Sequence, residues 1–122
     1  MRENEAASVK AEVGEGPVRY DLVPHVYIAS GVWPEATLTP DAPIGAYYAQ
    51  EIARRLKAAM TDRRLSQHKL AQRSGVSQRT IGRVLMGDTY CDVATLARLE
   101  FALETGIYPT RRFRGLPEES AG

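Results

Sequence analysis

The chain has 122 residues, 43% of them hydrophobic and 25% charged, which is the size and composition of one globular domain. No stretch approaches the roughly 20 consecutive apolar residues of a membrane-spanning helix, and no signal segment opens the chain. A single cysteine, Cys91, excludes a disulfide framework within the chain and favours a reducing compartment. We therefore expect a small cytoplasmic protein without a membrane partner.

The net charge of +1 conceals two parts of opposite sign. Residues 1–43 carry three basic and seven acidic side chains, whereas residues 44–122 carry thirteen basic and eight acidic ones. The contrast is sharpest in residues 51–90, where nine lysines and arginines stand against three acidic residues. Such a basic stretch is typical of a surface that binds a polyanion, and a solvated helical surface is the alternative interpretation.

The first part of the chain shows little regular patterning. Residues 1–17 are polar, lack apolar periodicity and end in glycines and a proline, which predicts a mobile tail. Residues 34–43 contain three prolines and are interpreted as a linker. We therefore expect residues 1–43 to form a flexible tail and an irregular arm.

Between these two segments, residues 18–34 are rich in β-branched and aromatic side chains. The alternation through Val26, Ile28 and Val32 predicts a short strand. Pro24 cannot donate a ladder hydrogen bond, so the strand is expected at an edge or in isolation.

From residue 44 the apolar positions recur with the helical period of 3.6 residues. The first stripe predicts a helix that starts near Pro43 and stops around residues 62–64, and its members are Ile52, Ala53, Leu56, Ala59 and Met60. The basic side chains of this segment lie largely off the stripe. One face of the helix is therefore expected to be buried.

Three shorter helices are predicted next, each after a residue that can cap its N-terminus. They span residues 67–73, 78–86 and 93–104, after Ser66, Ser77 and Asp92. Gly75 and Gly87 suit the ends of the first two, because glycine adopts the left-handed conformation without a steric penalty.

Gly106 and Pro109 are expected to stop the last helix, and one more turn near residues 106–109 would make a fifth. The predicted fold is therefore all-α, with four to five helices in residues 44–110. Residues 111–122 follow as a short tail.

The strongest signal lies in residues 67–86, which read QHKLAQRSGVSQRTIGRVLM. Ala71 must be small because the second helix crosses closely over the first, and Gly75 must accept a positive φ. Val76 and Ile81 must be apolar to hold both helices to the core. This pattern predicts a helix-turn-helix, whose second helix fits the major groove of DNA.

The stretch LSQHKLAQRSGVSQRTIGRVLMGD, residues 65–88, resembles the phage-repressor and Cro-like helix-turn-helix proteins, the XRE family. The resemblance covers roughly residues 46–108, and TLARLEFAL at residues 95–103 is similar to the family's fourth helix. It implies a sequence-specific regulator of transcription that binds double-stranded DNA.

The resemblance also implies which side chains contact DNA. The exposed start of the third helix reads base edges in this family, which implicates Gln78, Arg79 and Arg83; these residue types suit adenine and guanine edges. Phosphate contacts are implied for Gln67, Lys69, Arg73, Ser77, Thr80 and Thr89. The alternative for each is an ordinary solvated side chain.

Gly82 departs from what a recognition helix favours, because glycine in a helix costs about 1 kcal/mol relative to alanine. It either permits a close approach of the backbone to DNA or occupies an exposed position of no consequence. The second interpretation is slightly favoured.

The residues do not predict catalysis. We find no paired carboxylates with a plausible cleft, no Ser/His/Asp or Cys/His set, and no glycine loop that would cradle a phosphate. His25, His68 and Cys91 are too scattered to predict a zinc site, and neither histidine has a partner in view. We expect no enzyme activity, no metal and no cofactor.

A single module of this size makes few base contacts, so a homodimer on an inverted repeat is expected. Two surfaces are candidates for the dimer, the segment 104–116 and a strand within residues 18–33. Trp33 would serve that strand or cap the core of its own domain. The alternative function is an adaptor or antitoxin whose residues 18–34 are disordered alone and fold on a partner protein.

Overall fold

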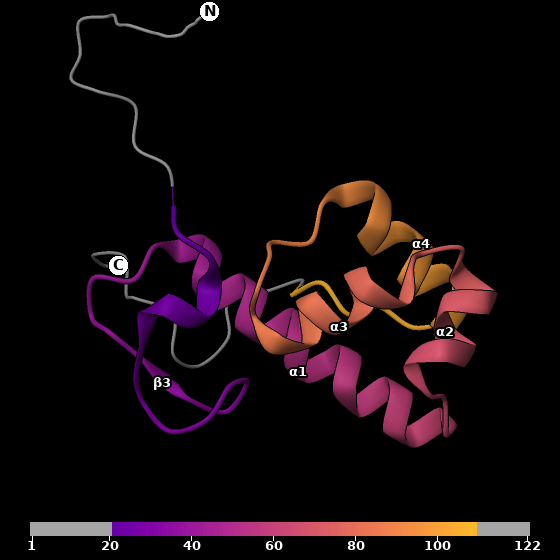
Figure 1. Ribbon diagram of the computed structural model, residues 1–122, viewed down its shortest axis with the longest axis horizontal. Coiled ribbons are helices and arrows are strands. Elements are labelled where there is room, and N and C mark those ends of the chain that lie inside the picture. Colours follow the sequence, from indigo (N-terminus) through magenta and orange to yellow (C-terminus); the bar gives the residue numbers. More distant parts are fainter. Residues whose placement is uncertain (1–20, 110–122) are drawn as a thin grey trace, which may run out of the picture.

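The computed structural model describes residues 21–109, and the tails predicted at residues 1–17 and 111–122 lie outside this range. The four helices are α1 (Ile44–Arg63), α2 (Gln67–Ser74), α3 (Gln78–Met86) and α4 (Val93–Leu103). Figure 1 shows the long α1 on one side and the three short helices packed beside and above it. The predicted all-α class is confirmed, with one small sheet before α1.

Each of the three short helices begins with a side-chain cap, as expected. Ser66 accepts a hydrogen bond from the N–H of Lys69 at 3.0 Å, and Ser77 accepts one from Thr80 at 3.1 Å. Asp92 accepts from the N–H of Thr95 at 2.8 Å. That backbone hydrogen bond is the main reason why the pKa of Asp92 lies below its usual value.

One apolar cluster joins all four helices. Its completely buried members are Leu56, Leu70, Ile81, Leu99 and Ile107. Because every helix contributes to this cluster, burying it positions α2 and α3 relative to α1 and α4.

The end of α4 differs from the prediction. The helix stops at Leu103 because Glu104 takes a left-handed conformation with φ of 58°, two residues before Gly106. No further helical turn forms in residues 104–109. The Glu100 carboxylate accepts the N–H groups of Ile107 and Tyr108 at 2.7 and 3.0 Å, so these donors need no helix.

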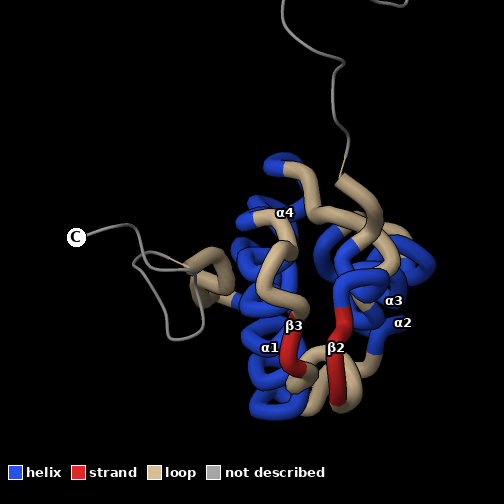
Figure 2. Tube along the Cα trace, turned by 90° about the vertical axis from the view of Figure 1, so that its left-hand side faces the viewer, coloured by secondary structure: helices blue, strands red, loops and turns tan. Residues whose placement is uncertain are grey.

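The N-terminal segment forms a short 3₁₀ turn, η1 (Pro24–Tyr27), and two strands, β2 (Ile28–Ser30) and β3 (Thr37–Leu38). The strands pair antiparallel, with Ile28 opposite Leu38, and lie beside α1 in Figure 2. The predicted strand forms, and in this two-stranded sheet it is an edge strand as expected, although Val26 and Val32 lie outside it. Both valines are instead exposed, and the strand finds its partner within the chain.

The interpretation of residues 34–43 as a linker is wrong. This segment contains β3 and buries Leu38 against a second apolar cluster, which also contains Trp33. The cluster rests on three alanines of α1, which are Ala46, Ala49 and Ala53. Small side chains at these positions leave room for the hairpin to approach α1 closely. The proline count alone did not reveal this packing.

Candidate nucleic-acid interface

The turn between α2 and α3 has the predicted geometry. Gly75 has φ of 75°, and a Cβ placed on it would meet nothing within 4 Å. Val76 follows with a buried side chain, while its N–H donates to Ser74 Oγ at 3.1 Å. Leu70 of α2 and Ile81 of α3 are completely buried. These buried side chains fix the turn to the core, and the opposite face of α3 is exposed to solvent.

That outward face carries the three side chains expected to read bases. Gln78, Arg79 and Arg83 are all exposed. Gln78 and Arg79 have no hydrogen-bond partner within residues 21–109, and Arg83 makes one long contact, donating to the Asp88 carbonyl oxygen at 3.4 Å. Neither α2 nor α3 contains an acidic residue, so no carboxylate of these helices neutralises this face.

The residues predicted to contact phosphate fall into two groups. Lys69 and Arg73 are exposed on α2 and have no partner in the part of the chain that the structure describes. The hydroxyl groups are already engaged: Ser77 Oγ donates to Thr80 Oγ1 at 2.9 Å, and Thr89 donates to the Tyr90 carbonyl oxygen at 3.3 Å. Lys69 and Arg73 are therefore more readily available for a phosphate contact than these hydroxyl groups.

Gln67 and Gly82 lie against each other. A Cβ at Gly82 would stand 3.1 Å from Gln67 Oε1, tighter than most contacts of that kind. Gly82 is half-buried and is therefore not the exposed position that was expected. The absence of a side chain at Gly82 lets the first residue of α2 lie across the middle of α3.

A polar hollow of about 180 Å³ lies between the end of α3 and the start of α4. It brings together three of the predicted contact residues, Thr80, Arg83 and Thr89. Thr95 of α4 also lines the hollow, and the sequence analysis missed it because the helical pattern marks it only as a non-core position. The Asp92 carboxylate lines the hollow as well, so the guanidinium and the hydroxyl groups share this space with one acidic side chain.

A protein-family model described as helix-turn-helix matches residues 56–107, from the middle of α1 to beyond α4. The chain carries a helix-turn-helix domain of the XRE type. Domains of this kind belong to DNA-binding regulators of transcription. The α2–turn–α3 unit lies wholly within the matched residues.

A similar solved structure is that of the restriction-modification controller protein C.AhdI from Aeromonas hydrophila, with 29% identity and a TM-score of 0.44. The similarity covers 45% of this chain and 83% of the other. No curated protein matches the chain. Among residues 21–109, no helix is long and apolar enough to span a membrane, and no three potential ligands gather as a metal site would require.

The sequence analysis missed a contact between the N-terminal hairpin and the end of α3 in this helix-turn-helix domain. Trp33 is buried against Gly87, the residue that ends α3 with φ of 75°. A Cβ on Gly87 would lie only 2.7 Å from Trp33 Cε2. Because the indole fills the space beside this glycine, the hairpin supports the point where α3 stops.

Hydrogen bonds strengthen the same contact. The N–H of His25 donates to the Gly87 carbonyl oxygen at 2.9 Å, and His25 Nδ1 lies 2.7 Å from Asp88 Oδ1. Tyr90 donates its hydroxyl to the Leu22 carbonyl oxygen at 2.7 Å. The sequence analysis found no partner for His25, because the residues concerned are more than sixty positions apart.

Cys91 lies half-buried in the loop after α3, and burial raises the pKa of its thiol to about 11. Its ordinary value of 9.0 applies to the unfolded chain, so between pH 9 and 11 the native state holds more protons than the unfolded state. We expect the free energy of unfolding to fall as the pH rises through this window. Urea denaturation of the wild type and of Cys91→Ala across the window measures the effect.

The variant should lose less stability over that range, since all other titrating groups are shared. Equal slopes for the two proteins would contradict the assignment of the effect to Cys91.

Proposed function

We propose that this protein is a sequence-specific transcription regulator that reads double-stranded DNA by inserting α3 into the major groove. The observation that carries the proposal is the outward face of α3, where Gln78, Arg79 and Arg83 are exposed on a helix without acidic residues. Arginine bonds guanine O6 and N7 in a bidentate manner, and glutamine bonds adenine N6 and N7 in the same way. These three side chains are the base-reading residues of the proposal.

The phosphate contacts of the proposal lie on both sides of α3. Lys69 and Arg73 present free cations from α2, and Gln67 lies across α3 at the start of α2. On the other side, Thr89 and Thr80 both line the polar hollow. Thr80 accepts a hydrogen bond from the capping residue Ser77. Such contacts fix the register of the protein on DNA and carry no sequence information.

The regulator acts as a homodimer in this proposal, and the exposed face of α4 suits the contact between its copies. Phe101, a large aromatic side chain, is 88% exposed on this face. The face around Phe101 is continuous along the helix, and its members are Ala94, Ala97, Arg98, Phe101 and Glu104. The strand candidate within residues 18–33 is less suitable, because β2 pairs with β3 and Trp33 is buried.

The α4 face is also complementary to itself. Arg98 and Glu104 stand three positions before and three positions after Phe101. If two copies of α4 cross antiparallel with the two-fold axis at Phe101, Arg98 of each copy faces Glu104 of the other. The two phenyl rings then meet at the axis, and the alanines let the helices approach. A two-fold interface of this kind needs one patch that contacts its own copy.

Phe101→Asp is therefore expected to separate the dimer, raising its Kd about 30-fold or more, as the loss of a central apolar anchor of about 2 kcal/mol does. Two like charges would also meet at the axis. Sedimentation equilibrium measures the change. Val32→Asp is the matched control, because Val32 is 79% exposed on the hairpin and should not alter the association. An unchanged Kd for Phe101→Asp would contradict the α4 interface.

The adaptor alternative predicts that residues 18–34 are unfolded without a partner protein. The part of this segment that the structure describes, residues 21–34, instead packs against α1 and the end of α3. Nothing within residues 21–109 favours the adaptor.

Selection from a pool of randomised duplexes, followed by sequencing of the bound fraction, tests the proposed function. The proposal predicts enrichment of an inverted repeat whose half-sites lie about one helical turn apart, roughly 34–36 Å. Binding that weakens with salt and enriches no sequence would show phosphate attraction alone and would contradict it.

A further inference from the structure

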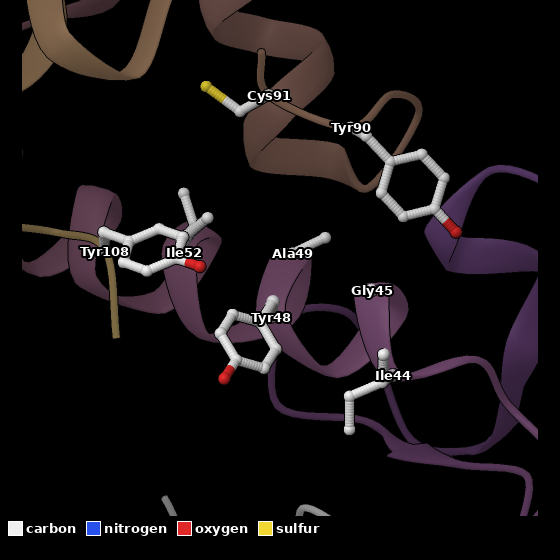
Figure 3. Close-up of a pocket in the computed structure, with 8 residues that line it drawn as sticks. All are labelled: Ile44, Gly45, Tyr48, Ala49, Ile52, Tyr90, Cys91 and Tyr108. Atoms are coloured by element: carbon white, nitrogen blue, oxygen red, sulfur yellow. The ribbon is translucent and has the colours of Figure 1, made fainter. Parts of the chain in front are cut away.

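An apolar groove of about 420 Å³ runs along α1. Ile44, Tyr48 and Ile52 form its floor. Tyr90 and Cys91 form one wall, and Tyr108 closes one end; Figure 3 shows these side chains around the open space. Ile44 is 55% exposed and Tyr108 45%, so the groove presents apolar surface to solvent within the described part of the chain.

The chain leaves the described region at this groove. Tyr108 is held by the Glu100 carboxylate, and its ring centroid lies 5.7 Å from that of Tyr48. Ile107 beside it is completely buried. The chain therefore continues from the Tyr108 end of the groove with the thirteen residues 110–122, which read TRRFRGLPEESAG.

We propose that residues 110–117 fold back along α1 and place the Phe113 ring in this groove. Phe113 is the one aromatic residue of the segment, and the groove offers it three tyrosine rings. Aromatic rings packed in this way gain from their edge-to-face geometry as well as from burial.

The chain length allows the contact. Ile44 and Ile52 are eight residues apart on a helix, so the floor is about 12 Å long at about 1.5 Å per residue. Phe113 follows Tyr108 by five residues, which span up to about 16 Å when extended. Phe113 therefore reaches every part of the floor.

Charge complementarity favours the same occupant. Two exposed carboxylates flank the wall of the groove: Asp21 lies close enough to Tyr90, and Asp92 to Cys91, to raise the pKa of each neighbour. Asp21 has no ion-pair partner within residues 21–109. The segment that follows Tyr108 carries three arginines around Phe113, at positions 111, 112 and 114. Arg55, at the Tyr108 end of the groove, is paired with Glu51 at 2.8 Å. A basic segment with one central ring suits an apolar groove with carboxylates along one wall.

Cys91 provides a probe of this contact, because it is the single cysteine of the chain and lines the groove. The rate of alkylation by iodoacetamide at pH 9 is measured on the full chain and on two variants. Phe113→Ala should raise the rate at least fivefold by uncovering the thiol. Val32→Ala is the matched control: it removes an exposed apolar side chain from the hairpin, outside the groove and the α4 face, and should leave the rate unchanged.

Three other outcomes of the alkylation experiment would overturn the proposal. An unchanged rate for Phe113→Ala means that its ring does not cover Cys91. A wild-type rate that falls as the protein concentration increases assigns the cover to a second copy, and a rate that rises equally in Val32→Ala shows that the effect is not specific to Phe113. Thermal melting of each variant identifies a rate increase caused by unfolding.

A second measurement does not depend on a substitution. In a mixture of isotope-labelled and unlabelled chains, nuclear Overhauser contacts should connect the Phe113 ring with Tyr48 or Cys91 of the same chain. Contacts between chains, or none to the groove, would overturn the proposal. Neither measurement involves DNA, so their result is separate from that of the proposed function.

Discussion

Gly87→Ala is expected to lower the free energy of unfolding by about 2–5 kcal/mol. The residue has φ of 75°, where a side chain costs about 1–2 kcal/mol. The new Cβ would also lie 2.7 Å from Trp33 Cε2, and overpacking of this kind costs about 1–3 kcal/mol more. Because the indole is buried between the hairpin and the helices, it cannot move aside freely. Urea denaturation measures the difference.

Gly75→Ala is the matched control for this prediction. Gly75 has the same φ of 75° and also ends a helix, but a Cβ there would meet nothing within 4 Å. Gly75→Ala should lower the free energy of unfolding only by the cost of a side chain in the left-handed conformation, about 1–2 kcal/mol. If both variants lost the same stability, the contact between Trp33 and Gly87 would not contribute. Trp33→Leu should in turn reduce the extra cost of Gly87→Ala, since it removes the obstructing atoms.

Arg79→Ala is expected to weaken binding to the selected operator by about 5- to 150-fold for each half-site. This corresponds to the roughly 1–3 kcal/mol that one bidentate arginine–guanine contact provides. The base preference at the contacted position should relax as well. Arg79 is exposed and has no hydrogen-bond partner in the described range, so its removal should leave stability within about 0.5 kcal/mol of wild type. Fluorescence anisotropy with the enriched duplex measures the affinity.

Lys57→Ala is the control for charge, because Lys57 is an exposed cation on α1. It should weaken binding only slightly and leave the base preference intact. An equal loss in both variants would indicate general attraction to phosphates and would contradict a base-reading role for Arg79.

The helices and the helix-turn-helix were predictable because their signals are local. The predicted range 78–86 is that of α3, and the predicted range 67–73 differs from that of α2 by one residue. Ser77 lies immediately before its helix, and Gly87 immediately after, so a short window of sequence contains both boundaries. The periodicity of apolar residues then identifies the buried face of each helix.

The support given by the N-terminal hairpin was not predictable in this way. Trp33 and Gly87 are distant in sequence, and no spacing rule connects them. The prolines of residues 34–43 suggested a linker, although Leu38 is buried there. The further turn expected near residues 106–109 does not form for a similar reason, because the Glu100 side chain accepts the backbone donors that this turn would have used. Contacts of this kind depend on the assembled fold.

These long-range contacts bear on DNA binding through the position of α3. The hairpin holds the residue that ends α3, and the turn at Gly75 holds its start. The helix between them is thereby fixed at both ends, while Arg79 and Arg83 stay in solvent. A rigid support beneath an exposed polar face is what direct readout of base edges needs.

Methylation interference on the selected operator tests the central claim most directly, since guanine N7 lies in the major groove. The account predicts that methylation of N7 at a guanine in each half-site blocks binding of the wild type. Arg79→Ala or Arg83→Ala should then lose sensitivity at one such guanine while other positions keep theirs. An interference pattern that is the same for wild type and both variants would contradict the insertion of α3 into the major groove.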